Sequence, residues 1–233
     1  MILLRNILFQ LAFYLGSIVL VLGVAVMALI SPRQARAGAH IWSRYVQICT
    51  RVFLGIRLQV DGTLPSGGGV IVAPKHESFY EAMLLPAIFP SAAVVMKREL
   101  SRIPVWGWVV TRHGSIFVDR EAKSSAMRSM LNAAARAVEE DREIVIFPEG
   151  SRAEAHQAPP LRPGVAGLYR LLKLPVVPVS LNSAHVWPRK GLKRPGTVRL
   201  KVMPVIPAGL PRDEFEARLH AAINGQTAGT TAP

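Results

Sequence analysis

The feature that constrains this chain most is an uncharged apolar run close to its amino terminus. No Asp, Glu, Lys or Arg occurs between Asn6 and Ser31, and the 24 residues Ile7–Ile30 are mostly Leu, Val, Ile, Phe and Ala. As a helix this run spans roughly 36 Å, enough to cross the ~30 Å hydrocarbon core of a bilayer. A buried core helix is normally shorter, and a signal peptide cleaved near residues 35–37 has an apolar stretch of only ~7–15 residues. The run therefore predicts a retained membrane helix over residues 7–30.

Arginines are concentrated on the carboxy-terminal side of this run. Arg5 precedes it, and Arg33, Arg36, Arg44, Arg51 and Arg57 follow it. The positive-inside bias therefore places the larger, carboxy-terminal part in the cytoplasm, attached to the inner (cytoplasmic) membrane.

Residues 35–56 have the periodicity of a basic amphipathic helix. Apolar residues recur there at steps of three and four: Ile41, Trp42, Tyr45, Cys49, Val52, Phe53 and Ile56. Such a helix suits the headgroup layer of a membrane, although an ordinary helix packed on the domain has the same pattern. Two arrangements of residues 1–56 are compatible with the sequence: one full span followed by a surface helix, and a two-helix hairpin that enters one leaflet.

The charge of the chain indicates anionic partners. There are 28 Lys and Arg against 15 Asp and Glu, a net charge of +13, while half of the residues are apolar. A surface this basic favours nucleic acid, anionic membrane lipids or phosphorylated substrates. The membrane run favours anionic lipids over nucleic acid, and no interleaved aromatic and basic platform is present. The apolar content excludes a disordered chain, and a single cysteine excludes an intrachain disulfide.

Residues 57–224 alternate between short β-rich runs and helical runs, which predicts an α/β domain with a mixed sheet covered by helices. The predicted strands are Arg57–Val60, Val70–Ala73, Ala93–Met96, Ser115–Val118, Ile144–Phe147, Val176–Leu181 and Thr197–Met203. The predicted helices are Tyr80–Ile88, Val105–Arg112, Ala122–Asp141, Val165–Leu172 and Arg212–Asn224. Continuous apolar strands such as Ile144–Phe147 indicate burial on both faces. Residues 225–233 are expected to form a flexible polar tail.

The first chemically informative block is Pro74-Lys75-His76-Glu77-Ser78-Phe79-Tyr80-Glu81, which joins a strand to a helix. His76 is a candidate base, and Glu81 is a candidate for orienting its imidazole. On a continuous helix the two side chains would point about 140° apart, so their contact requires His76 to precede the helix. Ser78 as N-cap satisfies that requirement. Ser78 and Glu81 also form a capping box, in which Glu81 simply bonds the backbone of the cap.

Three further blocks follow the ends of predicted strands. Gly114-Ser115-Ile116-Phe117-Val118-Asp119-Arg120 ends in an arginine that can hold a phosphate or pair with a neighbouring acid. Phe147-Pro148-Glu149-Gly150-Ser151-Arg152 offers a carboxylate, a glycine for close backbone approach and a second arginine, or a plain turn. The stretch from Val176 to Ser183 is by itself only a buried strand with a proline.

In this order and spacing, the four blocks resemble the glycerolipid acyltransferase family, and most of all its 1-acyl-sn-glycerol-3-phosphate acyltransferases. The resemblance covers about residues 57–205, and Phe147–Arg152 is its most specific block. A basic segment common in the family matches Met96-Lys97-Arg98-Glu99-Leu100. The family has Asp where this chain has Glu81, which keeps the charge and adds one methylene.

The resemblance implies a reaction and a role for each residue. The family transfers a fatty acyl group from acyl-CoA or acyl-carrier protein to the sn-2 hydroxyl of lysophosphatidic acid, giving phosphatidic acid. His76 is implied as general base and Glu81 as its orienting partner. Lys97, Arg120 and Arg152 are implied as contacts to the acceptor phosphate, with Glu149 and Gly150 shaping the site. No enzyme nucleophile and no cofactor beyond the thioester co-substrate are expected.

Several alternatives stay open at this level. An acyltransferase that acts on another lysolipid is compatible with the same four blocks. So is a non-catalytic membrane protein that binds anionic lipid. No histidine spacing indicates a metal site, so none is expected. The basic stretch Arg189–Arg194 is an exposed loop that docks acyl-carrier protein, contacts the bilayer or is simply solvated. Donor type, acyl-chain length, the oxyanion donor and the oligomeric state are not fixed by these residues.

Overall fold

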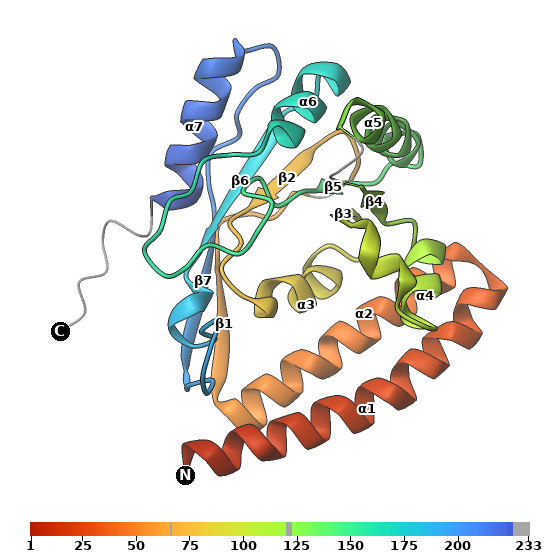
Figure 1. The fold of residues 1–233 in the computed structure, drawn as a ribbon, viewed down its shortest axis with the longest axis vertical. Helices are drawn as coiled ribbons and strands as arrows, with labels where there is room; N and C mark the ends of the chain where they lie inside the picture. The colour runs from red at the N-terminus through yellow and green to blue at the C-terminus, as the bar shows by residue number, and fades with distance from the viewer. Residues whose placement is uncertain (66, 120–122, 226–233) are drawn as a thin grey trace.

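A mixed sheet of seven strands forms the centre of the computed structural model, which describes residues 1–65, 67–119 and 123–225 (Figure 1). The strands are β1 (Ile56–Asp61), β2 (Ile71–Pro74), β3 (Ala93–Lys97), β4 (Ile116–Val118), β5 (Ile144–Val145), β6 (Val176–Leu181) and β7 (Gly196–Val202). Their order across the sheet is β1-β7-β6-β2-β5-β3-β4. Only the β6–β7 pair is antiparallel. The prediction of a mixed sheet covered by helices is therefore confirmed.

Both faces of the central strands are buried, as the continuous apolar runs predicted. In β2, Val72 belongs to the core on one face of the sheet, while Ile71 and Ala73 belong to the core on the other. In β5, Val145 and Ile144 divide in the same way. Since successive side chains of a strand point to opposite faces, each strand supplies apolar atoms to both cores. Strands of this composition stabilise the sheet only when helices cover it on both sides.

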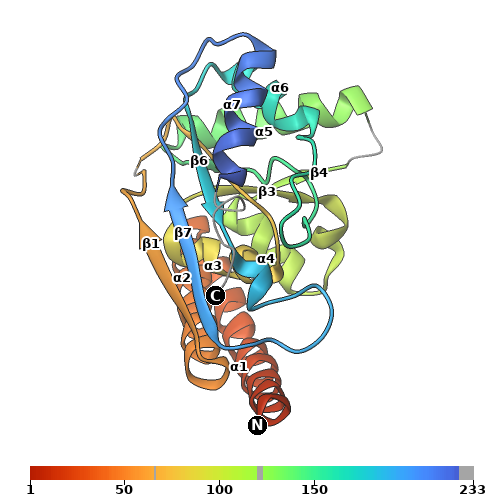
Figure 2. The ribbon, with the colours of Figure 1, turned by 90° about the vertical axis from the view of Figure 1, so that its left-hand side faces the viewer.

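The helices form one layer on each face of the sheet (Figures 1 and 2). One layer consists of α5 (Lys123–Glu139), α6 (Pro163–Leu172) and α7 (Arg212–Asn224). The other consists of α3 (Phe79–Ile88) and α4 (Trp106–His113), with α2 (Pro32–Cys49) packed against them and α1 (Ile2–Ile30) outermost. The helix α7 has the predicted bounds. Short η1 (Thr50–Leu54), η2 (Arg98–Arg102) and η4 (Ser183–His185) complete the elements.

The apolar run forms α1, which begins five residues earlier than predicted. It is the one helix among the described residues that is long and apolar enough to cross a membrane. Its outer face exposes a continuous apolar stripe, which includes Leu4, Leu8, Leu11, Leu15, Ile18, Leu22, Val26 and Leu29. The opposite face packs on α2. The exposed stripe is the surface that a lipid phase would cover.

The amphipathic segment differs from its predicted bounds of 35–56. The α-helix α2 ends at Cys49, a π-helical turn continues to Leu54, and Ile56 already belongs to β1. Gly55 ends the turn with a left-handed φ of 71°, a conformation that favours glycine. The helix α2 packs against both α1 and α3. On the predicted apolar face of residues 35–56, Cys49 is buried while Ile41 and Val52 are exposed, so the face is partly packed on the domain and partly open.

The parallel strands β6, β2, β5, β3 and β4 bring their carboxyl ends to the same edge of the sheet. The residues that follow these strands therefore converge, although the chain separates them by up to about a hundred positions. In α/β folds this edge is where ligands bind. The first, third and fourth blocks lie at the ends of the neighbouring strands β2, β5 and β6, and the described part of the second block lies at β4, at the outer end of the same edge.

Candidate active site

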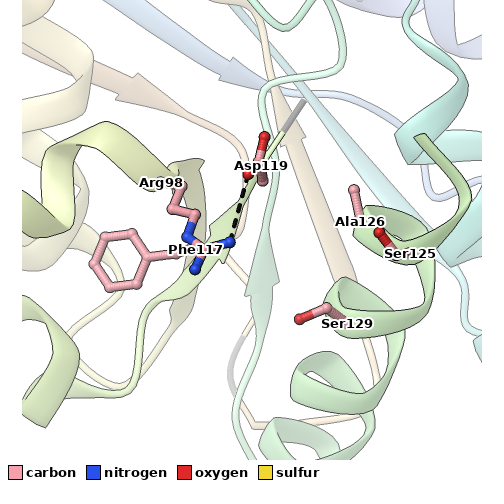
Figure 3. A pocket seen from close by; sticks show the side chains of 6 residues that line it. All are labelled: Arg98, Phe117, Asp119, Ser125, Ala126 and Ser129. Atoms are coloured by element: carbon pink, nitrogen blue, oxygen red, sulfur yellow. Dashed lines mark hydrogen bonds and ion pairs between the residues drawn. The ribbon is translucent and has the colours of Figure 1, made fainter. Parts of the chain in front are cut away.

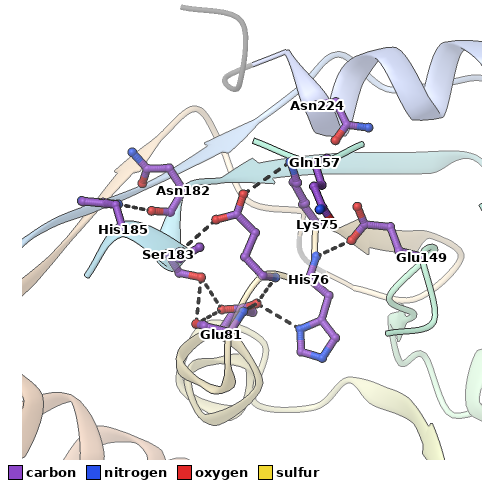
Figure 4. A network of polar contacts seen from close by, with 12 residues as sticks. Lys75, His76, Glu81, Glu149, Gln157, Asn182, Ser183, His185 and Asn224 are labelled. Carbon is purple, nitrogen blue, oxygen red and sulfur yellow. Dashed lines mark hydrogen bonds and ion pairs between the residues drawn. The ribbon is translucent and has the colours of Figure 1, made fainter. Parts of the chain in front are cut away.

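His76 lies in the connection between β2 and α3, ahead of the first helical residue, Phe79. Ser78 is the N-cap, with extended backbone and a side chain that accepts from the N–H of Tyr80. The imidazole Nδ1 of His76 lies 3.0 Å from Oε1 of Glu81 (Figure 4). The geometric condition for this pair, that the histidine precede the helix, is met.

Glu81 orients the histidine and caps the helix at the same time. Its Oε1 also accepts from the backbone N–H groups of Glu77 at 2.5 Å and Ser78 at 2.6 Å. The two interpretations of this carboxylate are therefore compatible, because one oxygen serves both. The extra methylene of Glu relative to Asp is accommodated by this turn of backbone, which brings three donors to one oxygen.

The second oxygen of Glu81 is held by two hydroxyls. Its Oε2 accepts from Ser78 Oγ and from Ser183 Oγ, each at 2.7 Å, and the two hydroxyl oxygens lie 2.8 Å apart (Figure 4). Ser183 comes from the end of β6, the strand that pairs with β2. The sequence interpretation gave Ser183 no role. Its only signal was its position two residues after a buried strand, behind Asn182.

The donors around Glu81 determine its charge. Burial acts to raise the pKa of the Glu81 carboxyl, but the hydrogen bond and charge of His76 and the hydrogen bonds of Ser78 outweigh burial and hold the pKa below its ordinary value. Glu81 therefore stays ionised. An ionised carboxylate beside Nδ1 favours the tautomer that carries its proton on Nδ1, which leaves Nε2 free to accept a proton.

The backbone of His76 is held on both sides by the loop that follows β5. Its N–H donates to Oε2 of Glu149 at 2.9 Å, and its carbonyl accepts from the N–H of Ala153 at 2.7 Å. Phe147, from the same loop, stacks on the imidazole with ring centroids 4.0 Å apart. Only about a sixth of the His76 side chain is exposed. Two of the four blocks thus fix the position of one ring.

Glu149 is buried, and its carboxyl carries one hydrogen bond on one oxygen. Its Oε1 has no hydrogen-bond partner among the described residues. Burial raises the pKa of Glu149 to about 7, against the lowering effects of the His76 N–H and of Lys75. Burial thus favours the neutral form of this carboxyl more than water does, and Oε2 accepts the His76 N–H in either form.

A buried ion pair joins the two residues on either side of His76. Lys75 Nζ lies 3.4 Å from Oε1 of Glu77, and both side chains are almost fully buried. Lys75 also donates to the carbonyl of Gln157 at 3.1 Å, and Oε2 of Glu77 accepts from the N–H of Ala184 at 3.0 Å. This pair therefore connects the segment that carries His76 to the loop after β5 and to the end of β6.

The model of the Acyltransferase family matches residues 56–182, which is more than half of the chain and includes the first three blocks and all but the last residue of the fourth. The chain belongs to the Acyltransferase family. The expectation of an acyl-transferring enzyme is thus confirmed at the level of the family.

Curated relatives of this acyltransferase have a consistent name. A 1-acyl-sn-glycerol-3-phosphate acyltransferase of Pseudomonas aeruginosa is 32% identical over 170 residues, 72% of this chain and 66% of that protein, just under two thirds of its length. One of Helicobacter pylori is 29% identical over 180 residues, 76% of this chain and 75% of that protein. The human 1-acyl-sn-glycerol-3-phosphate acyltransferase alpha is 28% identical over 219 residues, 90% of this chain and 76% of that protein.

The fold of this acyltransferase has also been observed in a crystal. The 1-acyl-sn-glycerophosphate (LPA) acyltransferase PlsC from Thermotoga maritima superimposes with a TM-score of 0.80, covering 100% of this chain and 99% of that one at 18% identity. At that identity the likeness concerns the fold. It extends through the amino-terminal helices, which confirms that α1 and α2 are part of the architecture.

The basic residues predicted for the acyltransferase site lie at the same edge of the sheet. Lys97 ends β3, two strands from β2, which at ~4.8 Å per strand puts the two chains about 10 Å apart. Arg152 is half-buried, and its guanidinium lies 4.7 Å from the ring centre of Phe79, the first residue of α3. Gly150 has a left-handed φ of 68°, a conformation that a residue with a side chain rarely adopts. Arg120 lies outside the described residues.

A pocket of roughly 380 Å³ lies further along this edge, between the ends of β3 and β4 and the first turns of α5 (Figure 3). It is lined by Arg98, Phe117, Asp119, Ser125, Ala126 and Ser129. Arg98 and Asp119 form an ion pair of 3.4 Å across one side. The pocket is separated from the His76 segment by β5. It adds polar volume on the side of the site where Lys97 lies.

Proposed function

We propose that this acyltransferase moves a fatty acyl group from an acyl thioester to the sn-2 hydroxyl of lysophosphatidic acid, giving phosphatidic acid and a free thiol. The observation that carries the proposal is the His76–Glu81 pair at 3.0 Å, with Nε2 of His76 unoccupied by any hydrogen bond among the described residues. The name shared by the curated relatives supports the choice of acceptor.

The reaction needs one proton to move twice. His76 Nε2 takes the proton from the sn-2 hydroxyl as its oxygen attacks the carbonyl carbon of the thioester. Glu81 stabilises the resulting imidazolium through the Nδ1 hydrogen bond, without accepting the proton itself. When the tetrahedral intermediate collapses, the C–S bond breaks and the proton passes from Nε2 to the departing thiolate. Direct attack requires no acyl-enzyme, in accord with a single, buried cysteine.

Cationic side chains near the strand ends suit the phosphate of the acceptor. Lys97 at the end of β3 and Arg152 above Phe79 are proposed to bind it, together with Arg120. Arginine gives a planar pair of donors to phosphate oxygens, whereas lysine contributes a point charge. Gly150 allows the backbone after β5 to approach the substrate closely. Acyl-CoA and acyl-carrier protein both remain candidate donors.

We further propose that α1 lies within one leaflet and does not cross the membrane. Near its start, Arg5 donates to the carbonyl of Phe53 at 2.8 Å, and near its end the carbonyl of Ala28 accepts from Arg112 at 3.0 Å. Between them, Trp42 donates to Ser17 at 3.0 Å. A helix attached to one domain along its whole length keeps both ends on one side of the bilayer. This favours the hairpin arrangement, on the cytoplasmic face of the inner membrane.

Acyl transfer in membranes that contain the chain tests the reaction. Wild type and His76→Ala are compared at matched expression, with lysophosphatidic acid as acceptor and acyl-CoA or acyl-carrier protein as donor in separate assays. Phosphatidic acid is expected from the wild type and not from the variant. Activity on a different lysolipid alone would overturn the acceptor, and equal product from both proteins would overturn the role of His76.

Thiol labelling tests the position of α1. A cysteine in a short hydrophilic extension before Met1 and, separately, Ser31→Cys are introduced in a Cys49→Ala background and exposed to a membrane-impermeant maleimide in sealed inverted vesicles. Both are expected to react from the cytoplasmic side. Reaction of only one of the two would show that α1 crosses the bilayer.

A further inference from the structure

The loop between η4 and β7 is fixed against the first turns of α1. Asn6 donates through Nδ2 to the carbonyl of Lys193 and accepts through Oδ1 from the N–H of Lys193, each at 2.9 Å. Asn6 is buried although it lies in an otherwise apolar helix. Its amide forms a reciprocal pair with the backbone of a loop 187 positions away. The position of the loop along α1 is therefore determined by the fold.

An aromatic contact strengthens the same junction. Trp187, at the start of the loop, is buried and meets the ring of Phe9 edge-on with centroids 5.5 Å apart. The ammonium group of Lys193 lies 5.1 Å from the ring centre of Trp187. The polypeptide from residue 188 to residue 195 extends beyond this junction, beside the amino-terminal end of α1 (Figure 2).

The outer part of the loop is basic and has no acidic counterpart. Arg189, Lys190 and Arg194 are exposed, and none of the ion pairs among the described residues involves them. No Asp or Glu occurs between Glu154 and Asp213. Exposed basic side chains that are not neutralised within the protein attract anions from solution. The position of the loop determines which anions it meets first.

One exposed leucine interrupts the charges. Leu192 is 42% exposed and follows Gly191, whose left-handed φ of 93° turns the chain. An apolar residue flanked by arginines and lysines is the composition of a segment that lies in the headgroup layer. The long cationic side chains remain among the phosphates while the leucine reaches the acyl boundary.

From these observations we infer that residues 188–195 form a second membrane contact, which binds anionic phospholipid headgroups through Arg189, Lys190 and Arg194. We call this segment the basic loop. The inference rests on the proposed attachment of α1 to a leaflet and goes beyond it. The exposed apolar stripe of α1 begins at Ile2, Leu3 and Leu4, next to the residues that hold the loop, so lipid that covers the stripe meets the loop as well. An anionic bilayer therefore fits this surface better than an acidic protein, which the membrane itself would exclude.

The basic loop has a consequence for substrate orientation. The domain then has two contacts with the bilayer. One is α1, which lies in the leaflet, and the other is the basic loop beside the amino-terminal end of α1. Because the loop lies beside the axis of α1 and not on it, its contact with the bilayer opposes rotation of the domain about that axis. The sheet edge that carries His76 is then held at one angle to the membrane from which a lipid acceptor arrives.

An environment-sensitive fluorophore at the loop tip provides the test. Leu192→Cys is labelled in a Cys49→Ala background, and the full chain is added to vesicles of phosphatidylcholine alone or with 30% phosphatidylglycerol. A label on Ala221→Cys, exposed on α7 in the opposite helix layer, is the matched control. The emission of the loop label is expected to shift to the blue only with the anionic lipid, and the shift is expected to decrease at high salt. A loop label that stays in water on both vesicles overturns the inference.

Charge removal tests the identity of the binding groups. The triple variant Arg189→Gln, Lys190→Gln and Arg194→Gln is expected to bind anionic vesicles roughly 100-fold more weakly, from a factor of about five for each charge. The matched triple Arg170→Gln, Arg212→Gln and Arg218→Gln removes the same charge from the far layer and is expected to change binding little. An equal loss of vesicle binding in both triple variants overturns the inference. So does a blue shift of the loop label with acyl-carrier protein but not with vesicles. Neither readout depends on catalysis, so failure of the proposed reaction is distinguishable from failure of the lipid contact.

Discussion

The backbone N–H of His76, after β2, donates to Glu149, after the neighbouring strand β5, at 2.9 Å. The same peptide unit thus connects the proposed base to a carboxyl whose second oxygen has no partner among the described residues. Glu149 holds the histidine through its backbone, while Glu81 holds it through its ring. The two carboxylates have different environments, and each leads to a separate prediction.

Glu81→Gln is expected to lower kcat by about 10²–10⁴-fold, because an amide cannot stabilise the imidazolium and can select the wrong tautomer. Glu81→Asp, the family residue at this position, should retain much more activity. The Michaelis constant for the acceptor should change little in either. Steady-state kinetics beside thermal unfolding would separate the roles: near-normal turnover in a stable Glu81→Gln protein would leave Glu81 with capping alone.

The stability of the protein should fall as pH rises through the titration of Glu149. Burial raises the pKa of Glu149 to about 7 in the folded protein, above its ordinary value of 4.5, so the folded state binds the proton more tightly than the unfolded state. The stabilisation is complete below pH ~4.5 and is lost as pH rises towards and past 7, by about 3 kcal/mol at most. Unfolding followed from pH 5 to 8 should show a shallower decline in Glu149→Gln. An unchanged slope in that variant would contradict the prediction.

Lys75 and Glu77 should be strongly coupled. Lys75→Met leaves the Glu77 carboxylate buried without its cation and is expected to cost about 3–5 kcal/mol of unfolding free energy. Lys75→Met combined with Glu77→Gln removes both charges and should recover a large part of that loss. A double-mutant cycle measured by denaturant unfolding gives the coupling directly, and additive losses would show that the pair does not interact.

Val105 is strained in a way that glycine should relieve. It precedes α4 with φ 60° and ψ −58°, and the N–H of Trp106 donates to the carbonyl of Pro104 at 2.6 Å, which makes a γ-turn of the rare hand. A β-branched residue seldom adopts such a conformation. Val105→Gly is expected to stabilise the protein by about 1 kcal/mol. Val105→Ala keeps a Cβ and serves as the control; a gain for alanine as large as that for glycine would refute strain as the cause.

The elements of the fold were predictable because their local patterns are strong. Each of the seven predicted strands corresponds to an observed one, since apolar runs with β-branched residues are bounded by glycines, prolines or charges. The largest error concerned residues 35–56, where helical periodicity continues through the π-turn to Phe53. Hydrophobic spacing does not distinguish an α-turn from a π-turn, so the end of α2 at Cys49 was not visible in the sequence.

The site was predictable only in its local part. His76 and Glu81 are five positions apart and belong to one turn of chain, so spacing and capping rules described them. Ser183 reaches Glu81 from 102 positions away because β6 pairs with β2, and no local pattern contains that pairing. Lys75 and Glu77 were within the first block but received no role, because their burial depends on contacts with Gln157 and Ala184, which lie far along the chain.

The pair between Asn6 and Lys193 joins two parts of the chain that are made at very different times. During synthesis α1 emerges well before Ser183 and before the loop that packs on α1. Until then the carboxylate beside His76 lacks Ser183, and Asn6 has no partner from the loop. The protein can therefore reach the membrane before Glu81 has its full set of hydrogen bonds. Attachment of α1 to the membrane thus comes before the site is complete. Residues 183–193 then supply both the Ser183 contact to Glu81 and the Lys193 contact to Asn6.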